Sequence, residues 1–162
     1  MRKKKTTRRE VLLRQAKLQM MASGEIECAE DNRPIPQSLQ ALYQELNDEH
    51  FNGELPDIPV VWNPGLRRAM GKAFYRSEGK GKRRGTRKGC EPVRIEIQQG
   101  KQWTPRALRK TMIHEMCHCW AYKYHGEVGH GTQFWKKMRK LGYQQGHRFP
   151  NQLPGEGDIY CL

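Results

Sequence analysis

The sequence lacks any long apolar run. Residues 1–9 are as basic as the start of a secretion signal, but the apolar stretch that follows is only three residues long and ends at Arg14. No other stretch approaches the roughly 20 apolar residues that a membrane-spanning helix needs. We therefore expect a soluble, intracellular protein with no membrane partner, either cytoplasmic or associated with DNA in a nucleoid or nucleus.

Cysteine is scarce and irregularly spaced. The five cysteines are an odd number, and none of them form a C-x-x-C pair (Cys28, Cys90, Cys117, Cys119 and Cys161). A secreted disulfide framework usually has an even number, so this pattern favours a reducing compartment. Because free cysteine buries readily, we expect Cys117 and Cys119 to be core residues and not metal ligands.

Acidic residues are fewer than basic ones. The chain of 162 residues has 30 Lys and Arg against 17 Asp and Glu, a net charge of +13. Residues 1–20 carry +7, residues 21–60 carry −8, and residues 61–162 carry +14. A basic half of this kind indicates a polyanionic partner, with nucleic acid ahead of anionic lipid. The alternative is a charged surface that only confers solubility, although mixed signs would serve solubility better.

The length allows one compact domain and an extension. We expect residues 1–36 to form a basic arm, a short amphipathic helix over residues 10–22 and an acidic linker. Residues 37–162 then form the folded domain, and we expect a monomer.

Helix and strand signals within that domain alternate along the chain. A helix is expected from Pro36 or Ser38 to Asn52, strands over 60–62, 71–76 and 93–97, and helices over 104–126 and 132–141. The basic, glycine-rich residues 77–92 are expected to form a long flexible hairpin loop. These elements predict an α+β fold with about three helices packed on a small antiparallel sheet of about three strands, plus the N-terminal helical extension.

A metal motif lies in the second of these helices. His114-Glu115-Met116-Cys117-His118 is an H-E-x-x-H sequence. A spacing of four residues places both imidazoles on one helix face, where they can reach a single Zn²⁺. Zinc lowers the pKa of a water that it binds towards about 7, so the neighbouring Glu115 carboxylate can act as general base.

A catalytic zinc site needs a third protein ligand and an open fourth position. The residues alone leave several candidates for that ligand. A histidine is preferred, and a downstream carboxylate is possible (His125, His130 or His147; Glu127 or Glu156). Gly126 can end the helix, and the segment after it can turn back to deliver His130.

These residues resemble the SprT-like zinc metalloprotease family, with its Spartan-type protease domain. The family pattern is H-E-x-x-H, a short spacer and then H-G-x-x-F, matched here by the motif and residues 130–134. The upstream block is similar at residues 46–47, 51–55 and 61–62 and at the glycine that begins strand 71–76. The resemblance spans roughly residues 38–145. It implies a zincin-like core, one catalytic Zn²⁺ on His114, His118 and His130, and Glu115 as the catalytic residue.

The resemblance also implies a biological role. The best-known activity in the family is DNA-activated degradation of proteins crosslinked to DNA, a form of DNA repair. Many members carry a cysteine-rich zinc-binding segment after the core. Only Cys161 follows the core here, so we expect that segment to be absent or replaced.

The sequence therefore predicts a zinc metalloendopeptidase that is DNA-associated and cleaves DNA-bound or DNA-crosslinked proteins. One alternative is a nucleic-acid-binding module with a structural or inactive zinc site, and a more distant one is a hydrolase of small molecules. Candidate donors to the oxyanion are Tyr122, Tyr124, Tyr143 and His147, which the sequence does not rank. Nine basic residues are candidate nucleic-acid contacts: Arg67, Arg68, Arg76, Lys80, Lys82, Arg83, Arg84, Arg87 and Lys88.

Overall fold

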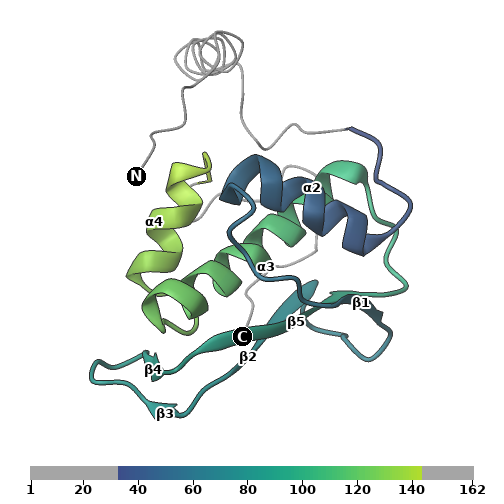
Figure 1. Cartoon of the computed structure of the whole chain (residues 1–162). Coiled ribbons are helices and arrows are strands. Elements are labelled where there is room, and N and C mark those ends of the chain that lie inside the picture. The colour runs from purple at the N-terminus through teal and green to yellow at the C-terminus, as the bar shows by residue number, and fades with distance from the viewer. Residues whose placement is uncertain (1–32, 144–162) are drawn as a thin grey trace, which may run out of the picture.

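The computed structural model describes residues 33–143 (Figure 1). The expected basic arm, the helix over 10–22 and the C-terminal tail lie outside the described residues. Within them the order of elements is α2 (Leu39–Phe51), β1 (Val60–Asn63), β2 (Gly71–Arg76), β3 (Gly79–Lys80), β4 (Arg87–Lys88), β5 (Glu91–Gln98), α3 (Pro105–His125) and α4 (Thr132–Lys140). The predicted α+β fold, with three helices and a three-stranded sheet, is confirmed.

Local sequence signals set the ends of the first two helices. Helix α2 begins after Ser38, whose hydroxyl accepts the Ala41 N–H at 3.1 Å, and ends at Asn52 in left-handed geometry with φ of 55°. Helix α3 begins after Thr104, whose hydroxyl accepts the Ala107 N–H at 3.2 Å. These are the caps and stops that the sequence predicts for these helices.

The main sheet has the order β1-β5-β2. Strand β5 pairs antiparallel with β2 but parallel with β1, so the prediction of a purely antiparallel sheet is wrong in this detail. The reason is that β5 returns between the two earlier strands instead of extending the sheet beyond β2. Its inward side chains Ile95 and Ile97 are fully buried, which suits a central strand.

The predicted loop over residues 77–92 is a structured hairpin. Its two short strands pair antiparallel, with Gly79 opposite Lys88 and Lys80 opposite Arg87. The predicted hairpin is therefore confirmed, and the two short strands within it are an addition to the prediction. Two-residue strands are too short to give an alternating pattern, so the sequence carried no strand signal here.

The three helices lie on one side of the sheet (Figure 1). Helix α3 packs on β2 and β5, while α2 and α4 pack against α3. The core fills the space between helices and sheet, and it includes Leu42, Leu46, Ile95, Met112, Met116, Cys117, Cys119 and Phe134. The prediction that Cys117 and Cys119 are core residues is confirmed. No helix within residues 33–143 has the length and apolar character to cross a membrane.

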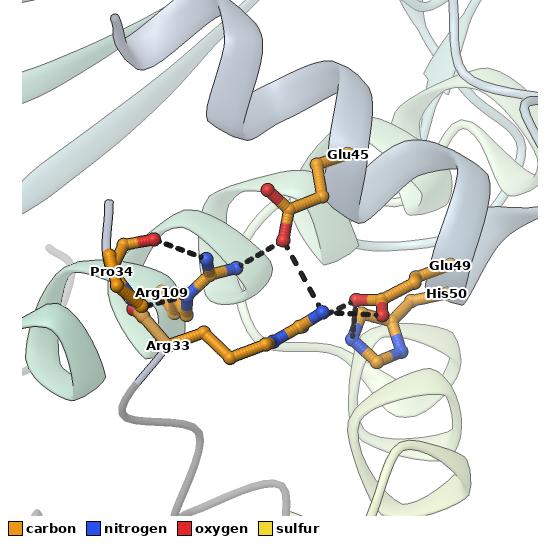
Figure 2. A network of polar contacts seen from close by, with 6 residues as sticks. All are labelled: Arg33, Pro34, Glu45, Glu49, His50 and Arg109. Atoms are coloured by element: carbon orange, nitrogen blue, oxygen red, sulfur yellow. Dashed lines mark hydrogen bonds and ion pairs between the residues drawn. The ribbon is translucent and has the colours of Figure 1, made fainter. Parts of the chain in front are cut away.

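A buried arginine joins the segment before α2 to helix α3 (Figure 2). Arg109 is only 2% exposed and donates to the Glu45 carboxylate at 2.8 Å and to the Pro34 carbonyl at 3.0 Å. Arg33 in turn pairs with Glu49 at 2.8 Å. Contacts of the folded core therefore extend at least to Arg33, while the domain boundary at 36/37 stays a prediction.

We expect Arg109→Ala to lower the free energy of unfolding by about 2–3 kcal/mol, because it leaves the Pro34 carbonyl without its charged donor and the Glu45 carboxylate with only the longer contact to Arg33 at 3.5 Å. Urea unfolding measures this as a lower midpoint at an unchanged slope. Arg139→Ala is the control, since Arg139 is an exposed arginine on α4. An equal loss in both variants would contradict the role given to Arg109.

Candidate metal centre

Three imidazoles converge beside the C-terminal half of α3. His114 and His118 come from α3, and His130 comes from the loop between α3 and α4. The His130 Nε2 atom lies 3.0 Å from His114 Nε2 and 3.2 Å from His118 Nε2. A tetrahedral metal with metal–nitrogen bonds of about 2.0–2.1 Å would hold its ligand nitrogens about 3.3 Å apart. The spacing of these atoms therefore fits a single tetrahedral metal ion such as zinc.

The loop over residues 126–131 delivers His130 to the other two histidines. Gly126 ends α3 with φ of 59°, and Gly129 has φ of 76°, both in the left-handed region that glycine adopts without strain. Glu127 then reaches forward, and its Oε1 accepts the Phe134 N–H at 2.9 Å in the first turn of α4. The loop is thus held at both ends, with His130 between them.

The histidine cluster is packed against aromatic rings. The fully buried Phe134 ring lies 4.9 Å from the His114 ring, 4.3 Å from His118 and 4.8 Å from His130, measured between centroids. The Tyr122 ring also stacks on His118, at 6.0 Å between centroids. This packing fixes the ring orientations, which is what a metal site requires of its ligands.

Burial keeps all three imidazoles neutral. It lowers the pKa of His114 to about 3, and repulsion from His130, when that ring is protonated, and from Lys110 acts in the same direction. The pKa of His118 is also held well below its usual value by burial and by the other two histidines, and burial lowers the pKa of His130. Neutral imidazole is the form that binds metals, so the site favours the ligand state of each residue.

Glu115 lies next to the cluster and is 1% exposed. Strand β2 passes close to it at Gly71. A Cβ added to Gly71 would lie 2.9 Å from Glu115 Cγ, 3.0 Å from its Oε1 and 3.1 Å from Thr111 Cγ2. Glycine is therefore needed for the close approach of the sheet to the Glu115 side chain. Sequence reasoning missed this role, and the available signal was a glycine at the start of a strand.

The other candidate ligands lie elsewhere. His125 is exposed, and its ring packs on Trp120 at 4.7 Å, outside the cluster. Glu127 is occupied at the start of α4, as described above. His147 and Glu156 lie outside the described residues. Among residues 33–143, no further histidine, cysteine or carboxylate joins the three histidines.

The candidate oxyanion donors are separated by the fold. The Tyr122 hydroxyl donates to the Ala73 carbonyl at 3.3 Å. The Tyr122 ring lies 6.0 Å from the His118 ring of the cluster, measured between centroids. The Tyr124 hydroxyl donates to the Glu54 carbonyl at 3.2 Å, at the loop that follows α2. Tyr143 is buried and its ring lies 5.6 Å from the Lys110 ammonium.

The nine basic candidates fall into two groups. Six of them line a hollow of about 670 Å³ beside the β3–β4 hairpin: Lys80, Lys82, Arg83, Arg84, Arg87 and Lys88. Arg67 and Arg68 lie instead in the loop between β1 and β2, at the opposite end of β2 from the hairpin (Figure 1). Arg76 ends β2 and is not among the residues that line the hollow.

Comparison with known proteins identifies related sequences. The sequence profile of the SprT-like family matches residues 39–154 of this chain. The germ cell nuclear acidic protein of Drosophila melanogaster is 35% identical over 100 residues, which cover 62% of this chain and 9% of that protein. The DNA-dependent metalloprotease SPRTN is 31% identical over 111 residues in Homo sapiens and 30% over 125 residues in Mus musculus. These matches cover 67% and 75% of this chain but 21% of each relative, so the chain spans a small part of their length.

We expect His130→Ala to weaken zinc binding more than about 100-fold. Loss of a residue that only orients a metal ligand costs about 10- to 100-fold in metal affinity, and this variant removes one of the three ligands itself. Competition with a coloured chelator measures the zinc dissociation constant. His125→Ala is the matched control, since this histidine lies five residues away and outside the cluster. Similar loss of affinity in the two variants would contradict the ligand set.

Proposed function

This chain belongs to the SprT-like family, and we propose that it is a zinc-dependent endopeptidase with Glu115 as general base. His114, His118 and His130 would hold the one zinc ion. The observation that carries the proposal is the convergence of three imidazole nitrogens within 4.8 Å of one another, beside a buried glutamate.

Zinc held there would polarise a peptide carbonyl and make a bound water more acidic. The part played by this chain is to orient the ligands and to move a proton. Glu115 accepts the proton of the attacking water and then delivers it to the leaving amine. The close approach of β2 at Gly71, where a Cβ would lie 3.0 Å from Glu115 Oε1, limits the positions that the carboxylate can occupy, so the base is held ready for the transfer.

The number of ligands favours catalysis over a structural zinc site. Structural sites are closed by four protein ligands, whereas catalytic sites keep the fourth position open. Three histidines form the group found within the described residues. A group of three ligands supports the catalytic site over a structural one.

We propose further that the enzyme acts on proteins bound or crosslinked to DNA, and thus in DNA repair. Relatives of this chain are named DNA-dependent metalloproteases. The net charge of +13 supports a polyanionic partner of the same kind. The nine basic residues named above are the candidate contacts, and the enzyme would act as a monomer.

We expect Glu115→Gln to lower the rate of peptide hydrolysis at least a hundredfold while zinc stays bound, because the amide cannot accept the proton. Cleavage of a DNA-binding protein is measured with and without DNA, alongside the zinc content. Glu91→Gln is the control, since Glu91 is an exposed glutamate at the start of β5. Hydrolysis that survives in Glu115→Gln would refute the mechanism.

We expect Gly71→Ala to lower kcat by roughly 10- to 100-fold with zinc affinity unchanged, because the new methyl group displaces the Glu115 carboxylate. The separation of kcat from zinc affinity distinguishes positioning from a general loss of structure. Gly65→Ala is the matched control, because its new methyl would contact only the Asn63 side chain. An unchanged kcat in Gly71→Ala would show that the close approach has no catalytic consequence.

A further inference from the structure

Backbone hydrogen bonds fasten the first half of the loop that carries His130. The Arg87 N–H donates to the Gly126 carbonyl at 2.6 Å, and the Val128 N–H donates to the Gly85 carbonyl at 2.8 Å. These two bonds join the loop to the β3–β4 hairpin. They fix the backbone as far as Val128, two residues before His130.

The second half of the loop begins at a glycine that packing does not restrain. Gly129 is exposed and has a left-handed φ of 76°. Among the described residues, nothing lies within 4 Å of the place that a Cβ of Gly129 would take. The position of His130, the next residue, therefore depends on contacts made by the residues that follow it.

The Glu127 carboxylate supplies such a contact. Glu127 lies three residues before His130, and its Oε1 accepts the N–H of Phe134, four residues after His130, at 2.9 Å. Phe134 is the third residue of α4, where the N–H is commonly satisfied by the side chain of the N-cap residue. The N-cap of α4 is Gly131, which supplies no side-chain hydrogen bond. Glu127 takes over that task, and its negative charge suits a helix N-terminus.

Gly131 makes room for this carboxylate. A Cβ at position 131 would lie 2.7 Å from each carboxylate oxygen of Glu127, and all three heavy atoms nearest to it would belong to that carboxyl group. The backbone does not itself require glycine here, because φ of −80° and ψ of −169° are extended values that any residue adopts. The seat of the Glu127 carboxylate is therefore the reason for a glycine directly after His130.

Phe134 links the same hydrogen bond to the whole histidine cluster. Its ring is fully buried and packs on all three imidazoles, as described above. The bond from its N–H to Glu127 fixes the backbone that carries this ring. Residues 127–134 are thus closed into a ring by one side chain, with His130 inside it.

From these contacts we infer that Glu127 is a positioning residue for the metal centre, and that its carboxylate holds the loop in the conformation that presents His130 as third ligand. A loop that is already in its bound conformation loses less conformational entropy when the metal binds. This role rests on the ligand set of the proposed function. It assigns a task to a carboxylate that lies outside the three-histidine group.

The zinc dissociation constant, measured by competition with a coloured chelator, tests this role. We expect Glu127→Ala to weaken zinc binding about tenfold, within the range for a residue that orients a metal ligand. Glu127→Gln keeps an oxygen that can accept the Phe134 N–H, so its zinc affinity should stay within about threefold of the wild type. Equal losses in the two variants would overturn the role of the hydrogen bond.

Glu78→Ala is the matched control. The Glu78 carboxyl group lies over a glycine in a similar way, since a Cβ on Gly89 would lie 2.7 Å from Glu78 Cδ. That contact is at the base of the hairpin and not in the loop that carries His130. We expect zinc affinity to be unchanged in Glu78→Ala, and a loss as large as that of Glu127→Ala would overturn the inference.

A double-mutant cycle tests the link between Glu127 and Gly131. We expect Gly131→Ala to weaken zinc binding by about the same factor of ten, because its methyl group displaces the carboxylate from the Phe134 N–H. Glu127→Ala/Gly131→Ala should bind zinc no more weakly than either single variant, because both changes remove the same contact. Independent effects would multiply to a loss of about 100-fold, and that result would overturn the inference.

Amide hydrogen exchange in the zinc-loaded protein reports on the bond itself. The Phe134 N–H should exchange faster in Glu127→Ala and Gly131→Ala than in the wild type and in Glu78→Ala. Faster exchange with an unchanged zinc dissociation constant would show that Glu127 only caps α4, and would overturn its role at the metal centre. Circular dichroism at saturating zinc checks that each variant keeps the fold.

None of these measurements depends on hydrolysis. Zinc binding that is weakened in His130→Ala but not in Glu127→Ala would remove this inference and leave the proposed function intact. The expected pattern in a protein that cleaves no substrate would support this inference while removing the proposed peptidase activity.

Discussion

The metal centre depends on the left-handed turn at Gly126. Two of the three histidines are placed by the regular spacing of α3, but the third must come from a chain that reverses direction directly after that helix. The φ of 59° at Gly126 makes the reversal possible. The Arg87 carbonyl occupies the place that a Cβ would take, so the same glycine also lets the hairpin dock. One residue thus serves both the third ligand and the basic hairpin.

Helix α3 contains several buried polar and charged side chains. Arg109, Lys110, Glu115 and His118 are each less than 5% exposed. Such groups are costly to bury unless they are paired or hold a metal. Arg109 is satisfied by Glu45 and by the carbonyls before α2, which ties the start of the described chain to this helix. The histidines are kept neutral and close together, an arrangement that a metal ion would stabilise and that links metal binding to folding.

The positive charge is organised by the fold and is not spread evenly. Six cations gather around one hollow whose other lining residues include His125, Glu127, Thr132 and Gln133. A surface that only confers solubility would not need this convergence. The hairpin that carries these cations is also hydrogen-bonded to the loop over residues 126–131, through the Arg87 N–H to the Gly126 carbonyl and the Val128 N–H to the Gly85 carbonyl.

The sequence by itself determined the features that depend on near neighbours. The Ser38 and Thr104 caps, the ends of α2 and α3, and the shared face of His114 and His118 all follow from contacts within five residues. Helix geometry also argues against His125, but only the tertiary structure brought His130 to within 3.0 Å of His114 and 3.2 Å of His118. Seven residues after His118, His125 lies about 10 Å along the helix axis and cannot reach the same ion. The central place of β5, the contact of Gly71 with Glu115 and the division of the nine cations also came only from the fold. Each joins residues far apart in the chain, whose distances are set by packing and not by local propensity.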